Sequence, residues 1–360
     1  MGQHASAGIS VQLPHRPRLL PGLDVLERAA DEIQIGLDPR HAVVAQGLPP
    51  NLIDLLRGLD GSRSTRTLLD AAGAVHGERL REILTGLTEC GLVEEAYPAA
   101  RHRKAAAEPE LWSLRAGLSR FDAAVRREQC CVLVHGGGRL AVAVSVLLAT
   151  AGIGRIDVRA AGTVGNDELG SGYLDTDIGR PRRRSILEAV LRANPDTRAG
   201  RSVDRRSPDL VLLTDAIVPA PEVVRGLLAD GLPHLPVQVR DGIGIVGPLV
   251  WPGRSSCLRC ADLHRTDRDS CWPRIASQLA GQSRRADLGA VQATASLAAT
   301  QALRVLCHNE GMPPVWNSTL EVDSYEATVY HRPWLPHPDC GCGAPAPGAP
   351  RPRSAMASPG

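Results

Sequence analysis

The sequence predicts an α/β protein in which a doubly wound, mainly parallel sheet follows a smaller helical domain. The 360 residues are enough for two domains. From residue 130 onward, short runs rich in Val, Leu and Ile alternate with longer helical patterns, as expected for parallel strands joined by crossover helices. A glycine turn at 136–138 joins the first of these strands to an apolar helix, which is the usual start of such a sheet.

The composition is that of an ordinary globular protein and argues against several classes of partner. Hydrophobic residues make up 43% and charged residues 22% of the chain, and the net charge is only +2. Neither this charge nor an aromatic content of 3% favours binding to nucleic acid or to an anionic membrane surface. The longest apolar stretch, 140–154, is shorter than the ~20 residues of a membrane span. Since no targeting segment is visible, we expect the protein in the cytoplasm.

The N-terminal part has the element pattern of a winged helix. We expect a flexible arm over 1–17 and this domain over 18–97. Alternating apolar residues and turn signals predict a two-stranded hairpin, then three amphipathic helices and a last short strand. The expected ranges are 32–36 and 42–45 for the hairpin, 52–59, 64–75 and 78–90 for the helices, and 92–94 for the strand.

A polar linker rich in Ala and Arg, 98–109, leads to the α/β domain, which we expect over 110–342. The tail 343–360 is rich in Pro, Ala and Gly and is expected to be disordered. Within the α/β domain, the apolar runs predict strands at 130–135, 155–158, 209–214, 237–239, 243–246, 318–322 and 327–331, and helices at 140–151, 183–193, 221–229 and 288–307.

Four of the nine cysteines form two close pairs, Cys257 with Cys260 and Cys340 with Cys342. Four thiolates can surround Zn²⁺ tetrahedrally and leave no position for water, so such a site is structural. It would also close a loop of roughly 80 residues, which stabilises the fold. A disulfide or a redox pair is the alternative. The other cysteines lie mostly on apolar faces, as buried thiols do: Cys90, Cys130, Cys131, Cys271 and Cys307.

The glycine turn stands where a nucleotide-binding loop would, between a strand and a helix. Backbone N–H groups at the start of that helix could bind phosphate. Two features argue against it: the bulky Arg139 stands where phosphate would approach, and no acidic residue ends the next strand to bind a ribose. Asp157 is near that position but lies in mid-strand. In the alternative interpretation, the glycines serve only the packing of helix on strand.

Several motifs together resemble the ubiquitin-activating superfamily of ThiF and MoeB. They are "AGIGRI" at 151–156, "DIGRP" at 177–181, "NPD" at 194–196, the pair at 214–215 and the two cysteine pairs in the same order. The resemblance covers about 110–342. It implies a ThiF-like fold with a structural zinc, and in active members it implies adenylation of a C-terminal carboxylate with MgATP.

The same resemblance assigns the nucleotide site residue by residue. Gly136 and Gly138 correspond to the phosphate loop and Asp215 to the acid near Mg²⁺. Arg182 stands where the family usually has Lys. Other positions depart from the family: Ala160 and Gly162 replace acids, and 168–171 replaces the segment that supplies an Arg. We therefore expect ATP and Mg²⁺ binding to be weak or absent and assign no catalytic residue.

A narrower resemblance concerns 247–253 ("GPLVWPG") and 262–269 ("DLHRTDRD"). These segments are similar to the branch attached to azoline-forming peptide maturation (TOMM or bacteriocin biosynthesis), often labelled cyclodehydratase. That branch joins a PqqD-like winged helix, the leader-peptide recognition element, to a non-adenylating ThiF-like domain. It implies two partners, the leader of a ribosomal precursor peptide and a YcaO-type enzyme, and is compatible with a homodimer. His264 is expected to be a structural hydrogen bonder beside the zinc.

A leader peptide would pair with an exposed strand edge. The expected edge includes Val43 and Val44, and Arg79 and Arg81 on the third helix suit an acidic leader. Two other interpretations stay open. One is a working ThiF-type adenylyltransferase, and the other is a nicotinamide oxidoreductase, which the glycine turn and Asp157 suggest.

Overall fold

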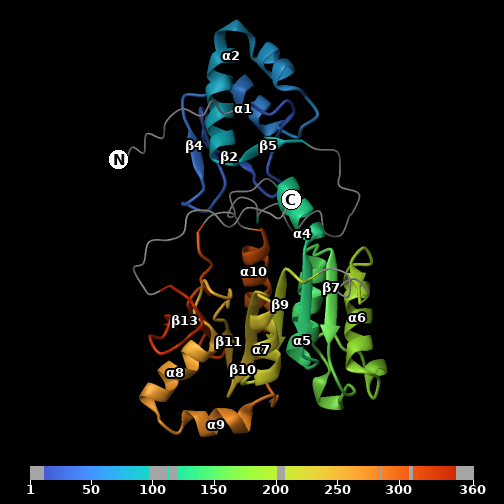
Figure 1. Ribbon diagram of the computed structural model, residues 1–360. Coiled ribbons are helices and arrows are strands. Elements are labelled where there is room, and N and C mark those ends of the chain that lie inside the picture. Colours follow the sequence, from blue (N-terminus) through green and yellow to red (C-terminus); the bar gives the residue numbers. More distant parts are fainter. Residues whose placement is uncertain are drawn as a thin grey trace. The chain divides into compact units, whose positions relative to one another are not determined.

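The computed structural model describes residues 12–96, 112, 120–200, 207–283, 285–307 and 311–345 (Figure 1). The chain divides into two compact units, Met1–Ala123 and Ala124–Gly360. The linker predicted at 98–109, the first eleven residues of the arm and most of the predicted tail lie outside the described residues.

Residues 12–96 of the first unit form two small sheets and two helices. Strands β2 (Val25–Ala29), β3 (Glu32–Ile35) and β4 (Val43–Ala45) form an antiparallel sheet in that order, and β1 (Pro17–Leu19) pairs with β5 (Val93–Glu95). The predicted hairpin is confirmed, because Ile33 lies opposite Ala45 and Ile35 opposite Val43. In this sheet β4 is an edge strand. The helices are α1 (Pro50–Arg57) and α2 (Thr65–Glu89).

Helix α2 accounts for the second and third predicted helices. Gly73 interrupts the helix with a φ of +72°, a backbone conformation that is disfavoured for residues other than glycine. The Ser64 hydroxyl caps the start by accepting a hydrogen bond from the Thr67 N–H at 3.1 Å. Leucines at helical spacing on α1 and α2 pack against β3 to form the core: Ile33, Leu52, Leu56, Leu80 and Leu84. That this unit is a winged helix stays a prediction.

The last residues of the predicted arm belong to this unit. The Thr65 N–H donates to the His15 carbonyl at 2.8 Å, and the His15 N–H donates to the Glu95 carboxylate at 2.5 Å. Pro17 begins strand β1. These bonds tie 15–17 to the start of α2 and the end of β5.

The second unit is built on one eight-stranded sheet with the order β13-β12-β11-β10-β9-β6-β7-β8. Neighbouring strands from β10 to β8 are parallel, and those from β10 to β13 are antiparallel. The strands are β6 (Cys131–His135), β7 (Arg155–Arg159), β8 (Arg198–Ala199), β9 (Leu210–Thr214), β10 (His234–Arg240), β11 (Ile243–Val246), β12 (Ser318–Asp323) and β13 (Thr328–Pro333). The helices are α4 (Arg120–Gln129), which spans the division between the units, and α5 (Arg139–Thr150), α6 (Arg182–Ala193), α7 (Pro221–Ala229), α8 (Leu258–Arg268), α9 (Trp272–Leu279) and α10 (Leu288–Cys307).

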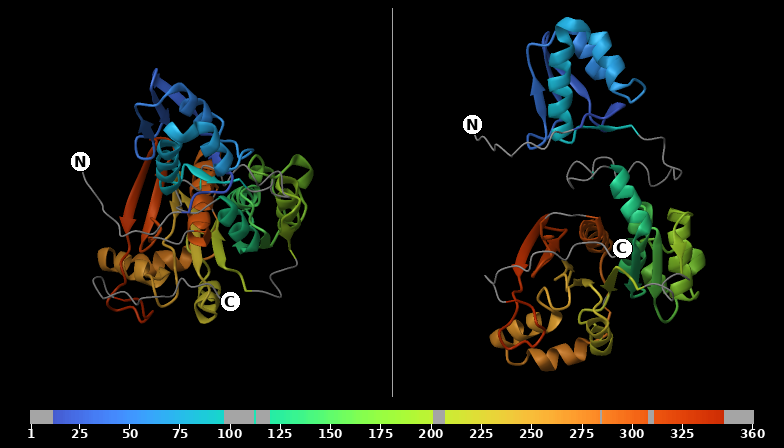
Figure 2. Two further views of the ribbon diagram at one scale, coloured as in Figure 1. Left: turned by 90° about the horizontal axis from the view of Figure 1, so that it is seen from above. Right: turned by 45° about the horizontal axis from the view of Figure 1, so that its top comes forward.

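This topology confirms the predicted doubly wound, mainly parallel sheet. The parallel strands run β8-β7-β6-β9-β10, so the chain reverses its direction of winding between β6 and β9. Right-handed crossovers place α5 and α6 on one face and α7 on the other, and α10 packs on α5 (Figure 2). The reversal leaves a crevice beyond the carboxyl ends of β6 and β9, where this class of sheet binds ligands. No helix among the described residues is long and apolar enough to cross a membrane.

Candidate functional site

The crevice of the second unit is a cleft of about 440 Å³. The end of β6, the glycine turn and the end of β9 form its floor, and Gly281 and Ser283 also border it. Its polar lining includes His135, Glu168, Arg182, Asp215 and Glu222. The structure thus brings the three predicted nucleotide-site residues, Gly136, Gly138 and Asp215, to one place.

The glycine turn is already bound to a carboxylate of this chain. Gly138 is the N-cap residue of α5, and its N–H donates to Asp215 Oδ2 at 2.9 Å. The Thr214 hydroxyl lies 3.1 Å from the same oxygen. Asp215 holds this position with φ of +70°, which is strained for a non-glycine residue. An N–H group that could bind phosphate is therefore satisfied from within the molecule.

Close contacts at each position of the turn explain its three glycines. A Cβ on Gly138 would lie 2.7 Å from Asp215 Oδ1, and one on Gly136 would lie 2.6 Å from Asp215 Oδ2. A Cβ on Gly137 would lie 2.9 Å from the Ala160 side chain. Close packing alone therefore accounts for three successive glycines, as in the alternative interpretation of the sequence.

The charges of the cleft disfavour a triphosphate. Among the described residues, its lining carries the carboxylates of Glu168, Asp215 and Glu222 and one guanidinium, that of Arg182. Arg182 is engaged by Glu168, with Nη2 and Oε2 2.9 Å apart. Burial raises the pKa of the Asp215 carboxyl, and the negative charge of Glu168 raises it further, although hydrogen bonds from Gly138 and Thr214 oppose the rise. The net negative charge of these lining residues would repel a polyphosphate unless bound cations neutralised it.

Two further residues that the sequence associated with this region, Arg139 and Asp157, do not line the cleft. The expectation that Arg139 stands in the path of phosphate is wrong, because its side chain reaches the Ala286 carbonyl at 3.4 Å and does not line the cleft. Asp157 pairs with Arg183 at 2.9 Å and does not line the cleft either. The acid that a nicotinamide site would need is therefore held elsewhere.

Sequence reasoning missed Glu222, which lines the cleft, and Tyr173, which holds the glycine turn. Tyr173 donates its hydroxyl proton to the Gly137 carbonyl at 2.6 Å and so fixes the glycine turn from the other side. Glu222 comes from the first turn of α7. Neither lies in a motif, and only the fold brings them to the turn.

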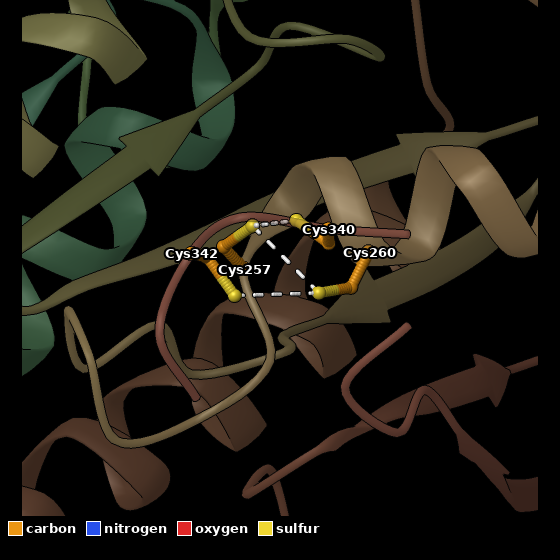
Figure 3. A group of neighbouring side chains, drawn as sticks. All are labelled: Cys257, Cys260, Cys340 and Cys342. Carbon is orange, nitrogen blue, oxygen red and sulfur yellow. Dashed lines mark hydrogen bonds between the residues drawn. The ribbon is translucent and has the colours of Figure 1, made fainter. Parts of the chain in front are cut away.

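The four paired cysteines converge, as predicted. Cys257 is the N-cap residue of α8 and Cys260 lies in its first turn, while Cys340 and Cys342 come from the C-terminal segment (Figure 3). The Sγ atom of Cys257 lies 3.8 Å from that of Cys260 and 3.6 Å from that of Cys340. The Sγ atoms of Cys260 and Cys342 are 3.6 Å apart. These separations exclude disulfide bonds in this structure.

The cluster fits a tetrahedral zinc ion. With Zn–S bonds of about 2.3 Å, a regular tetrahedron has S···S edges of about 3.8 Å. Burial raises the pKa of the Cys257 thiol and raises that of Cys340 to about 11, whereas at Cys342 burial is outweighed by hydrogen bonds, which lower its pKa. A bound cation would therefore be needed to hold Cys257 and Cys340 as thiolates at neutral pH. Zinc at this site would be structural, because the four thiolates complete its coordination. That the metal is zinc stays a prediction.

The first unit carries an apolar groove beside the edge strand β4. The groove has a volume of about 160 Å³ and lies between the sheet and the second half of α2. Val43 lines it, whereas Val44, one residue on in the strand, is 42% exposed. Its full lining is Ile33, Ile35, Val43, Ala45, Ile83, Gly86, Leu87 and Cys90.

The two predicted arginines lie on different sides of α2. Arg79 is one turn before Ile83 and lines a second hollow with His76 and Gly47, next to the end of β4. Arg81 is two residues from both Arg79 and Ile83. Its side chain therefore lies about 200° around the helix axis from that of Ile83 and faces away from the groove. Each arginine pairs with a neighbouring glutamate, Arg79 with Glu82 at 3.1 Å and Arg81 with Glu78 at 3.4 Å.

No family model and no curated protein matches this chain. Solved structures do. The microcin C7 biosynthetic enzyme MccB in complex with N-formylated MccA superposes with a TM-score of 0.69 over 91% of this chain and 99% of its own, at 16% identity. The chain has the MccB fold. E. coli MccB with ATP gives a TM-score of 0.68, also at 16% identity and with the same coverage. PaaA gives 0.65 at 15% identity, over 87% of this chain and 98% of its own.

The MccB likeness confirms the predicted ThiF-like fold of the second unit and extends beyond that unit. The second unit makes up about two thirds of the chain, so a match over 91% includes much of the first unit as well. At this level of identity the likeness is one of fold.

Proposed function

We propose that this protein is a non-adenylating, ThiF-like scaffold in the maturation of a ribosomally made peptide. The first unit binds the leader of the precursor peptide, and the protein presents that precursor to a YcaO-type cyclodehydratase. The observation that carries this proposal is the apolar groove beside the edge strand β4.

An edge strand beside an apolar groove suits an extended peptide. The free edge of β4 offers main-chain hydrogen bonds, and alternate side chains of an added strand enter the groove on one face. Val43 and Ala45 face the groove, and Ile83 and Leu87 form its other wall. Arg79, just beyond the groove, suits an acidic side chain of the same peptide.

The cleft of the second unit supports the absence of adenylation. Adenylation needs cationic groups that stabilise the triphosphate in the transition state. Here Arg182 is paired with Glu168, and the Gly138 N–H is bound to Asp215. MccB has been solved with the peptide MccA, which supports peptide binding by this fold.

An active adenylyltransferase is the second candidate function. MccB has also been solved with ATP, and in this chain Asp215 lies in the cleft beside the glycine turn. This candidate requires Asp215 to release the Gly138 N–H and to bind Mg²⁺ instead.

Substitution of Gly86 by Leu tests the groove. Gly86 lines the groove within helical backbone, and a Cβ there meets no atom within 4 Å, so a larger side chain fills the groove without a clash. Leu also favours the helix by about 0.8 kcal/mol over Gly. A peptide selected on the full-length protein from a displayed random library would serve as the probe. We expect its affinity, measured by fluorescence anisotropy, to fall at least about tenfold in Gly86→Leu.

Gly226→Leu is the matched control. Gly226 is an exposed glycine of α7, and its Cβ likewise meets no atom within 4 Å. This variant should bind the peptide as the wild type does. Arg79→Ala should weaken an acidic peptide while Arg81→Ala should not, because only Arg79 lies beside the groove. Equal binding by Gly86→Leu and the wild type would refute the groove as the leader site.

A further inference from the structure

A second cluster of metal-ligating side chains lies on α8, apart from the four cysteines. His264 and Asp267 project from α8 at positions i and i+3, and His337 comes from the C-terminal segment. One nitrogen or oxygen of each lies within 4.8 Å of the others. Two histidines and one carboxylate in a facial arrangement are a frequent ligand set for transition metals.

We propose that His264, Asp267 and His337 form a second metal site that binds a divalent first-row transition ion. Its three protein ligands leave coordination positions open. The occupant is therefore exchangeable, unlike an ion enclosed by Cys257, Cys260, Cys340 and Cys342.

The distance between two of the ligands fits a shared metal ion. His337 Nε2 lies 2.9 Å from Asp267 Oδ2. Two ligands at about 2.1 Å from a metal and at right angles to each other are about 3.0 Å apart. An ion could therefore replace the proton between these two atoms with little movement of either side chain.

The backbone sets the tautomer of His264. Its Nε2 lies 3.0 Å from the Leu335 carbonyl, which can only accept a hydrogen bond. Nε2 therefore carries the proton, and the lone pair of the neutral ring is on Nδ1. Metal-binding histidines commonly donate their other ring N–H to a backbone carbonyl in this way.

His337 needs one change of tautomer and a small movement of Asp339. Without metal, Nδ1 accepts the Asp339 N–H at 3.1 Å and Nε2 donates to Asp267. With metal on Nε2, the ring proton moves to Nδ1 and the bond from the Asp339 N–H is lost; the Asp339 carboxylate, 4.0 Å away, accepts this proton once it moves about 1 Å closer. A carboxylate behind a ligating histidine is the usual second partner of such a ligand.

The surroundings allow an ion to enter. The His337 side chain is only 4% exposed, but that of Asp267 is 62% exposed. The site therefore has one buried, fixed ligand and one at the surface. Both metal sites would join α8 to the C-terminal segment, so an ion at His264, Asp267 and His337 would reinforce the same connection as the cysteine cluster.

Cobalt binding to the untagged full-length protein, loaded with zinc at the cysteines, tests the proposal. We expect one further equivalent of Co²⁺, with weak d–d absorption and no sulfur-to-cobalt charge-transfer band. Asp267→Asn and His264→Gln should each weaken it at least about tenfold, because each removes one ligand. Both replacements can keep the native hydrogen bonds, since Asn accepts from His337 and Gln donates to Leu335.

Asp269→Asn is the control, because Asp269 is a neighbouring exposed carboxylate outside the cluster. It should bind Co²⁺ as the wild type does. Zinc content and circular dichroism identify any variant that has lost its fold. Absence of a saturable second equivalent, or wild-type affinity in either Asp267→Asn or His264→Gln, would overturn the proposal and leave the cluster a set of structural hydrogen bonds.

Discussion

Replacing Cys340 and Cys342 together by Ser should destabilise the second unit strongly. With both ligands gone from the C-terminal segment, a metal bound by Cys257 and Cys260 can no longer connect that segment to α8. Cys257 and Cys340 are 83 positions apart in sequence, so the metal closes a long loop. A long loop gains much conformational freedom when its cross-link is cut.

The size of the effect follows from that loop length. The chain-entropy relation for a cross-link over a loop of this length gives about 4–5 kcal/mol as an upper bound. For a unit of this size each kcal/mol corresponds to about 2–4 °C in Tm, so the largest expected loss is about 8–20 °C.

Differential scanning calorimetry of the full-length protein measures this loss, and metal analysis of the same samples reports the zinc content. Cys271→Ser is the control, because Cys271 lies outside the cluster and is exposed; the expectation of a buried thiol is wrong for Cys271 and for Cys90. The control variant should keep both the Tm and one zinc per chain. A double variant with the wild-type Tm, or a wild-type protein that holds no metal, would refute the structural zinc.

Three smaller changes test the cores and the cleft. Leu84→Ala, at a fully buried position of the first unit, should cost about 2–5 kcal/mol in the free energy of unfolding, measured in urea. Gly136→Ala should lower the Tm of the second unit, because the new Cβ meets the Thr214 hydroxyl and φ is +145°; an unchanged Tm would show that the turn can yield. Asp215→Asn should raise the Tm at pH 7 more than at pH 4. The folded protein raises the pKa of this carboxyl above its unfolded value, so its ionisation costs stability as the pH rises, and Asn avoids that cost. A constant difference in Tm across this pH range would contradict that sign.

The alternation of apolar runs was sufficient to predict most of the parallel sheet. The run at 210–214, for example, is fully buried as β9. Helices α8 and α9 were not predicted, because α8 is rich in charged residues and α9 spans only eight residues. The cysteines at the start of α8 and the packing around Trp272 hold them instead. Such elements depend on tertiary contacts, which periodicity does not reveal.

The candidate sites show the same division. Spacing alone predicted that the four cysteines meet. The hydrogen bond between Gly138 and Asp215 joins residues 77 positions apart, and no local sequence pattern predicts it. The direction of the Arg139 side chain could not be predicted either, because it depends on a contact with the loop that precedes α10. By contrast, helical phase in the sequence already separates Arg79 from Arg81. The leader peptide, the YcaO-type partner and the homodimer stay predictions.

ATP–pyrophosphate exchange by the full-length protein, with the selected peptide bound, tests the central claim most directly. A scaffold binds the peptide but does not activate it, so exchange should stay at the background of a protein-free sample. The Gly138 N–H engaged by Asp215 and the Arg182 guanidinium engaged by Glu168 are the reason for this expectation. Exchange well above background that disappears in Asp215→Asn would contradict the scaffold and establish an adenylating enzyme.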